Sequence, residues 1–175
     1  MLDTRTLSDS VPFTELPENL DQLISLRCLS LWHLVIMSVP QSIAKLSHLE
    51  TLNLYYSYFQ SPLPKSLKLL KLKLSNSCID SVPIRLWHLE IGIFSKKATD
   101  TYILEQHFSQ LATLETLSIS CYNVKFLPSI TGLHNLRELM LNGCFNLREL
   151  PANLNELVNL STLNINDTRI KIRPL

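Results

Sequence analysis

The side chains that most often carry out chemistry are scattered along this chain, without the spacing that a known type of site requires. No histidine stands at metal-ligand spacing from a cysteine or a carboxylate. No Gly-x-x-x-x-Gly-Lys segment is present to hold a phosphate, and no Gly-x-Ser-x-Gly segment is present to supply a nucleophile. We therefore predict that the chain is not an enzyme and has no metal and no cofactor, because catalysis would need a convergent pocket that the sequence does not indicate. The residues concerned are His33, His48, His88, His107, His134, Cys28, Cys78, Cys121 and Cys144.

Aromatic and basic side chains offer a different kind of chemistry, the recognition of another protein. Aromatic rings beside cations are the side chains that contribute most to protein interfaces. In this sequence the candidates flank pairs of apolar residues in the first half of the chain. Two interpretations stay open: the side chains form a binding surface, or the rings pack locally over the rim while the lysines form a solvated strand face. The candidate protein-binding residues on the predicted concave face are Trp32, Tyr55, Lys71, Lys73 and Phe94.

The elements that would position these side chains repeat along the chain. In the stretch from Leu16 to Leu31, Pro17 is followed by apolar residues at steps 3, 6, 9, 12 and 14. Steps of three suit an irregular helical turn, and the final step of two suits a short strand with one buried face. The same steps follow Pro40 and Pro151, and a helical bundle would not repeat proline in register. Self-similarity over ~20–29 residues is typical of leucine-rich repeats.

We therefore predict an α/β solenoid of leucine-rich repeats, with parallel strands on the concave face and short, irregular helical turns on the convex face. One unit cannot bury its leucine stripe alone, so its neighbours must cover it. We assign residues 1–175 to one leucine-rich repeat domain of about seven repeats, truncated mid-repeat at both ends. The eight predicted strands end at residues 7, 31, 54, 74, 93, 119, 141 and 165.

Two neighbouring units are shorter than the others. Their predicted strand pairs are Leu72 with Leu74 and Ile91 with Ile93, each four residues early when counted from the preceding proline. The strands can still pair, because their spacing of ~4.8 Å is set by the ladder and not by the outer turns. We expect the shorter turns to flatten the local curvature. The buried turn positions of these two units are predicted at Leu67, Leu70, Leu86 and Leu89.

Composition and charge argue against several classes of partner. The chain has 16 Lys and Arg against 15 Asp and Glu, a balance that favours neither nucleic acid nor an anionic membrane. The amino-terminal residues lack the apolar run of a signal peptide, and no stretch approaches the ~20 apolar residues of a membrane helix. The dispersed cysteines are typical of free thiols in a reducing compartment. We expect a cytoplasmic protein that binds neither nucleic acid nor a membrane.

Two segments resemble a particular class of leucine-rich repeat. Residues 46–54 (Leu-Ser-His-Leu-Glu-Thr-Leu-Asn-Leu) and 141–151 (Leu-Asn-Gly-Cys-Phe-Asn-Leu-Arg-Glu-Leu-Pro) are similar to the repeats of intracellular plant disease-resistance proteins. One departure concerns the position three residues past the last strand leucine, where many leucine-rich repeats place an Asn whose amide bridges neighbouring turns. Five of the eight residues here can still make a small polar contact. These positions hold Ser10, Leu34, Ser57, Ser77, Lys96, Tyr122, Cys144 and Thr168.

The resemblance implies a function and its partners. It implies a non-enzymatic recognition module, the ligand-sensing and autoinhibitory repeat region of a plant immune receptor that acts in the defense response. The partners would be a pathogen effector or a host protein, and a nucleotide-binding domain that is not in this chain. The alternatives are a freestanding scaffold or adaptor, such as a ubiquitin-ligase substrate reader, and an inactive gene fragment. An upstream phosphate loop would favour the receptor, and an upstream F-box-like segment would favour the adaptor.

Overall fold

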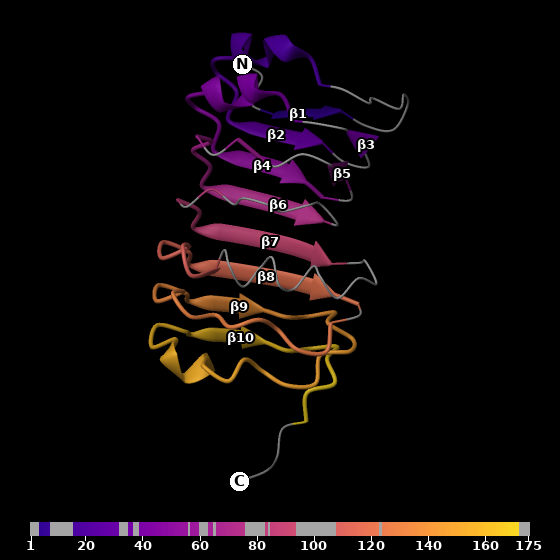
Figure 1. The fold of residues 1–175 in the computed structure, drawn as a ribbon, viewed down its shortest axis with the longest axis vertical. Helices are drawn as coiled ribbons and strands as arrows, with labels where there is room; N and C mark the ends of the chain where they lie inside the picture. Colours follow the sequence, from indigo (N-terminus) through magenta and orange to yellow (C-terminus); the bar gives the residue numbers. More distant parts are fainter. Residues whose placement is uncertain are drawn as a thin grey trace. The chain divides into compact units, whose positions relative to one another are not determined.

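The chain divides into two compact units, residues 1–86 and residues 87–175. Among the described residues, the main sheet of each unit has four parallel strands that lie side by side in chain order (Figure 1). The assignment of residues 1–175 to a single domain stays a prediction. The computed structural model describes residues 4–7, 16–31, 35–36, 39–55, 57–59, 63–64, 66–75, 83, 85–93, 108–122 and 124–171.

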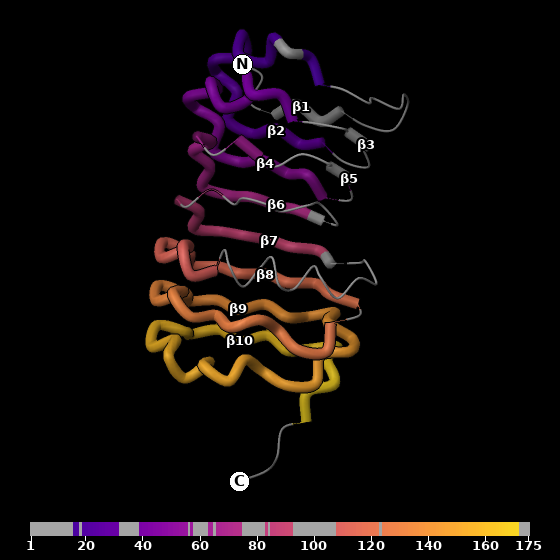
Figure 2. Tube along the Cα trace, viewed as in Figure 1, coloured from indigo at the N-terminus to yellow at the C-terminus, as the bar shows by residue number. Residues whose placement is uncertain are grey.

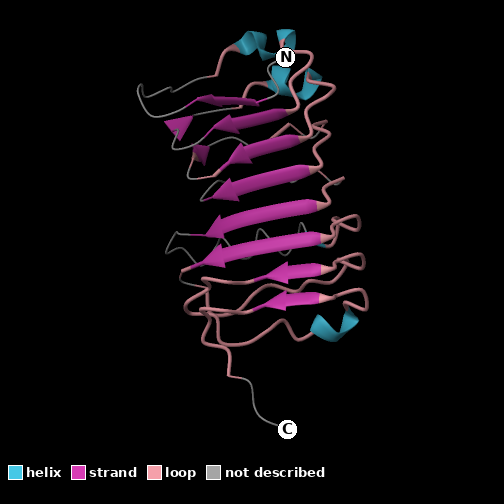
Figure 3. Cartoon of the chain, turned by 180° about the vertical axis from the view of Figure 1, so that it is seen from behind, coloured by secondary structure: helices cyan, strands magenta, loops and turns pink. Residues whose placement is uncertain are grey.

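The first unit is built on a four-stranded parallel sheet. Its strands are β1 (Thr4–Leu7), β2 (Cys28–Leu31), β4 (Thr51–Leu54) and β6 (Lys71–Ser75), and a separate small sheet pairs β3 (Val35–Ile36) with β5 (Tyr58–Phe59). The 3-10 helices η1 (Glu18–Gln22) and η2 (Gln41–Lys45) lie at the edge where the strands begin (Figure 3). Each helix begins directly after a proline, whose ring fixes the backbone φ at this point.

The second unit repeats this plan with shorter strands towards its end. Its strands are β7 (His88–Ile93), β8 (Thr116–Cys121), β9 (Glu138–Met140) and β10 (Thr162–Asn164), and the 3-10 helix η3 (Leu154–Glu156) precedes β10. After β8 and after β9 the chain turns at the carboxyl end of the strand and runs back alongside the strands (Figure 2). The repeat class and the short helical turns are therefore as predicted, and the chain forms a leucine-rich-repeat solenoid.

Strand pairing places equivalent apolar residues next to one another, as the repeat pattern predicts. In the first unit Leu52 lies between Leu29 and Leu72, and in the second unit Leu117 lies beside Leu139. Because successive side chains point to opposite faces of a strand, these leucines share the buried face, and β4 and β8 alternate between half-buried and buried residues. The eight predicted strands are present, although β9 and β10 end one residue earlier than predicted, β6 ends one residue later and β8 ends two residues later.

The predicted register of β7 is wrong. The structure pairs Leu89 with Leu117 and Ile91 with Ile119, so Leu89 and Ile91, and not Ile91 and Ile93, are the strand pair of this repeat. The reason is a buried leucine that stands three residues before the first strand leucine and closes the turn onto the core. Counting three residues forward from this leucine gives the register, whereas counting forward from the proline does not. In six repeats this residue is Leu26, Leu49, Leu69, Leu86, Leu114 and Leu136.

The predicted burial of Leu70 is also wrong. Its exposed fraction is 42%, whereas the preceding Leu69 is 0% exposed and takes the core position. The shortening of this unit falls between its proline and Leu69, so steps of three counted from the proline land one residue too late. Residues 71–75 and 88–93 are strands, as the shortened units require. The effect of the short turns on curvature stays a prediction.

Candidate protein-binding surface

The predicted binding residues Lys71 and Lys73 lie on the side of the first unit's sheet opposite the buried leucines, here called the strand face. Strand pairing sets them in two rows, Cys28–Thr51–Lys71 and Ser30–Asn53–Lys73. Ser30 is buried and the other five residues are half-buried. Since two residues span ~6.6 Å along a strand, Lys71 and Lys73 place two positive charges close together on this face. That they bind a partner stays a prediction.

Tyr55 follows β4 directly and is half-buried. Its backbone N–H donates to Oδ1 of Asn53 at 3.1 Å, and the N–H of Asn166 donates in the same way to Oδ1 of Asn164 at 3.0 Å. An Asn at this strand position thus ends the strand with a local turn, because its side chain captures an N–H that the ladder would otherwise use. This turn holds the backbone of Tyr55 beside the row that contains Lys73. Trp32 and Phe94 lie outside the described residues.

The strand face of the second unit carries small polar and acidic residues. The corrected register of β7 pairs Glu90 with Ser118 and Gly92 with Ser120 on this face. Glu138 and Met140 follow on β9. The two strand faces therefore differ in chemistry: the lysines lie on the strand face of the first unit, and that of the second unit carries two carboxylates and several hydroxyls beside His88 and Met140.

The position three residues past the last strand leucine does bridge neighbouring turns. Ser57 Oγ donates to the carbonyl of Leu31 at 2.6 Å, and Cys144 Sγ donates to the carbonyl of Ile119 at 3.3 Å. Thr168 donates within its own turn, to the carbonyl of Ile165. The prediction of small polar contacts is confirmed for Ser57 and Cys144. Of the other positions named for this ladder, Ser10, Leu34, Ser77 and Lys96 lie outside the described residues.

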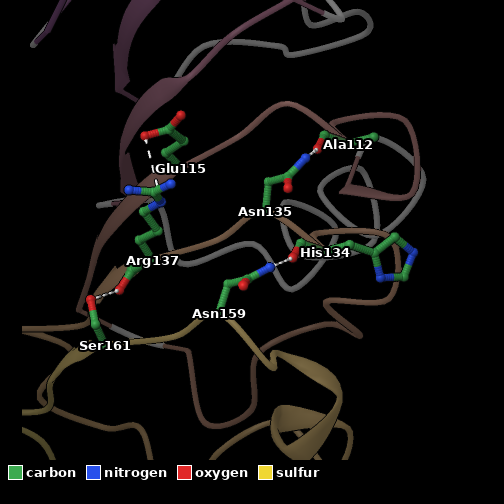
Figure 4. Close-up of polar contacts among 7 residues, drawn as sticks. All are labelled: Ala112, Glu115, His134, Asn135, Arg137, Asn159 and Ser161. Carbon is green, nitrogen blue, oxygen red and sulfur yellow. Dashed lines mark hydrogen bonds and ion pairs between the residues drawn. The ribbon is translucent and has the colours of Figure 1, made fainter.

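A second ladder, which the sequence reasoning missed, runs along the edge where the strands begin (Figure 4). Asn135 Nδ2 donates to the carbonyl of Ala112 at 2.7 Å, and Asn159 Nδ2 donates to the carbonyl of His134 at 2.8 Å. Both asparagines stand four residues before the first strand leucine. In the first unit His48 takes this position, and its Nδ1 lies 2.9 Å from the carbonyl oxygen of Ile24. The recurrence of polar residues at this step was the signal that could have revealed it.

Ion pairs between repeats lie on the surface. Glu115 and Arg137 approach within 4.0 Å, and Asp21 and Lys45 within 3.2 Å. The hydrogen bond from Lys45 holds the pKa of Asp21 below its usual value. Exposed pairs of this kind contribute little to stability, because water screens the charges and the long side chains lose freedom.

Cys121 and Cys144 form a buried thiol pair in the second unit. The Cys121 thiol donates to Cys144 Sγ at 2.6 Å, and this hydrogen bond together with burial raises the pKa of Cys121. Both are free thiols, as is the half-buried Cys28. Among the described residues, no three His, Cys, Asp or Glu side chains gather closely enough to hold a metal ion. None of the helices that the structure describes is long and apolar enough to cross a membrane.

Comparisons with known proteins agree with this geometry. Residues 65–168 match the family model described as R13L1/DRL21 leucine-rich repeats. The chain belongs to this family. A probable disease resistance protein of Arabidopsis thaliana is 32% identical over 157 residues, which is 82% of this chain and 18% of the relative. The chain therefore resembles the repeat region of a plant disease-resistance protein and spans about a fifth of that relative's length.

A solved structure shows the same fold. The leucine-rich repeat domain of the type III effector XopL superposes with a TM-score of 0.51 at 21% sequence identity, and the match covers 89% of this chain and 58% of that one. At this identity the likeness extends to the repeat fold and not to what the effector does.

Proposed function

We propose that the chain is a non-enzymatic protein-recognition module, the ligand-sensing and autoinhibitory repeat region of a plant immune receptor. The strand face of the first unit carries the proposal, because Lys71 and Lys73 lie two residues apart on β6 and pair with Thr51 and Asn53 of β4, which Tyr55 directly follows. Aromatic rings beside cations are among the side chains that contribute most to the binding free energy of protein interfaces. Membership of the R13L1/DRL21 family and the similarity to a disease-resistance protein support this assignment.

The proposed partners are a pathogen effector or a host protein, and a nucleotide-binding domain of the same receptor. Lys71 and Lys73 favour a partner surface with carboxylates, because charge complementarity speeds the encounter and sets its orientation. The proposal places the chain in the cytoplasm, where effectors that enter a plant cell would meet it. The free thiols at Cys28, Cys121 and Cys144 support a reducing compartment.

Proximity labelling in plant leaf cells tests the strand face. The chain is fused to a biotin ligase and compared with a Lys71→Glu, Lys73→Glu variant and with a control, Lys68→Glu, Arg85→Glu, which makes the same charge change at exposed turn positions of the same unit. We expect that a set of proteins is labelled by the wild type and by the control variant. The strand-face variant should not label these proteins. Identical labelling by all three proteins would contradict the proposal.

The aromatic positions are tested by the double substitution Trp32→Ala, Tyr55→Ala. We expect binding of a partner found by labelling to weaken at least tenfold, while the midpoint of urea unfolding stays close to that of the wild type. A parallel loss of binding and of stability would show that the rings are structural.

A further inference from the structure

An exposed aromatic surface lies away from the strand face, in the turns that follow β8 and β9. Tyr122, Phe126 and Phe145 are 57%, 56% and 49% exposed. The rings of Tyr122 and Phe145 meet edge to face, with centroids 5.7 Å apart and planes at 60°. Large rings usually bury most of their area in a fold, so three of them exposed in two adjacent turns indicate a contact surface.

Backbone contacts hold these two turns side by side. Asn146 Nδ2 donates to the carbonyl of Tyr122 at 2.7 Å, and the N–H of Arg148 donates to the carbonyl of Lys125 at 3.0 Å. Phe126 forms an isolated parallel bridge with Glu149. The aromatic rings are therefore presented on a braced backbone, which lowers the entropy that a partner's binding would cost.

Positive charge is concentrated beside the rings. Arg148, Glu149, Arg169 and Lys171 line an open depression of about 570 Å³. With Lys125, this region holds four exposed cations and one carboxylate, although the whole chain carries a net charge of only +1. Within the described part of the chain, no ion pair or side-chain hydrogen bond neutralises these four cations.

We propose that this surface, the edge patch (Tyr122, Lys125, Phe126, Phe145, Arg148, Arg169 and Lys171), docks an acidic segment of a protein partner that carries a large apolar side chain. The carboxylates of the segment would lie over the depression, where the cations are in excess, and its apolar side chain would lie against the Tyr122–Phe145 pair. A single-stranded nucleic acid fits less well, because it requires cations along a continuous groove and successive stacking platforms. Here Arg148, Arg169 and Lys171 line one open depression, and the two rings pack edge to face and do not form successive platforms. The proposal does not rest on the proposed function of the strand face.

Fluorescence anisotropy of the 175-residue chain with defined probes tests the edge patch. The probe is a fluorescein-labelled peptide, acetyl-Glu-Glu-Trp-Glu-Glu-amide. Its controls have Ala in place of Trp or Lys in place of Glu, and an oligothymidylate of ten nucleotides tests for nucleic acid. We expect the acidic Trp peptide to bind most tightly, the Ala peptide at least threefold more weakly, and the affinity of both to fall as salt is raised. An oligothymidylate that binds as tightly as the acidic Trp peptide, or no binding of that peptide at low salt, would overturn the proposal.

Two variants with equal charge changes locate the site. Arg148→Glu, Arg169→Glu should weaken peptide binding at least tenfold, whereas Lys68→Glu, Arg85→Glu, at exposed turn positions of the first unit, should leave it unchanged. Equal loss in both variants would mean diffuse charge attraction and would refute a built site. Arg148→Gln, Arg169→Gln provides a milder version, and circular dichroism of each variant shows that it is folded. Because these variants leave the strand face unchanged, failure of this proposal and failure of the proposed function give different results.

Discussion

Ser57 shows how one side chain joins two repeats. The residue is 2% exposed, in a core made almost entirely of leucine, and its hydroxyl donates to the carbonyl of Leu31 in the preceding repeat. A carbonyl at the end of a buried strand must find a donor, since leaving it unpaired costs free energy. A small hydroxyl reaches it without displacing the neighbouring leucines.

Replacing Ser57 with Ala is expected to destabilise the chain by ~1–3 kcal/mol, because the buried carbonyl of Leu31 loses its donor. Urea unfolding followed by circular dichroism measures the change. The control is Ser66→Ala at an exposed position, which should shift the free energy of unfolding by less than ~0.5 kcal/mol. Equal midpoints for the two variants would show that the hydroxyl of Ser57 is not needed.

The cysteines should differ in reactivity towards iodoacetamide. Cys28 is half-buried, whereas Cys121 and Cys144 are 1% and 0% exposed and the pKa of Cys121 is raised. Since the thiolate is the reacting form and must meet the reagent, Cys28 should be alkylated at least tenfold faster than either. Timed alkylation followed by peptide mass spectrometry gives the three rates. Similar rates for all three would contradict the buried pair.

At the scale of the element, two turns of the second unit depend on glycine for different reasons. Gly132 has φ +96°, and a Cβ added there would lie 2.8 Å from Cα of Ser109 in the preceding repeat. Gly143 has φ +79°, but an added Cβ would meet only Cε2 of Phe145, at 4.0 Å. Gly132 therefore permits both a left-handed backbone and the close stacking of two turns, whereas Gly143 permits the backbone alone.

The two alanine substitutions separate these effects. Gly143→Ala should cost ~1–2 kcal/mol for the left-handed conformation. Gly132→Ala should cost that amount and ~1–3 kcal/mol more, because the backbone of Ser109 must shift to make room. Urea unfolding of the two variants gives the difference directly. If Gly143→Ala proved the more harmful, the close approach at Ser109 would be refuted.

The ladder along the starting edge of the strands should contribute to the stacking of the turns. Asn135→Ala removes the donor to the carbonyl of Ala112 and should cost ~0.5–1.5 kcal/mol in the free energy of unfolding. The matched control is Asn155→Ala, at an exposed position of η3. Equal stability of the two variants would mean that water replaces the ladder without loss.

At the scale of the whole molecule, stability is shared between neighbouring repeats. Leu52 is 0% exposed and lies between Leu29 and Leu72, so each repeat is covered by the next. Leu163 on β10 occupies the equivalent strand position and is 38% exposed. Because a repeat is stable only through its neighbours, damage at a fully covered position should spread beyond its own repeat.

Leu52→Asp is therefore expected to unfold several repeats, since it buries a charge without a partner and removes a core side chain. The loss should appear as a large drop in the circular dichroism signal and as hydrogen exchange in β2 and β6 as well as in β4. Leu163→Asp should have a much smaller effect, because water reaches that position. Unchanged urea unfolding of Leu52→Asp would count against the assigned core.

The spacing of leucine and proline by itself determined the repeat class, the eight strands and most of their register. This was possible because a step of two marks a half-buried strand and a step of three marks a turn, whatever lies beyond the repeat. Only the tertiary structure decided the register of β7, the burial of Leu69 in place of Leu70, and the gathering of Tyr122, Phe126 and Phe145 at one edge. Each of these features depends on which residues of one repeat lie against the next repeat. The stacking of the repeats decides this, because neighbouring repeats are aligned by their strands while their turns differ in length.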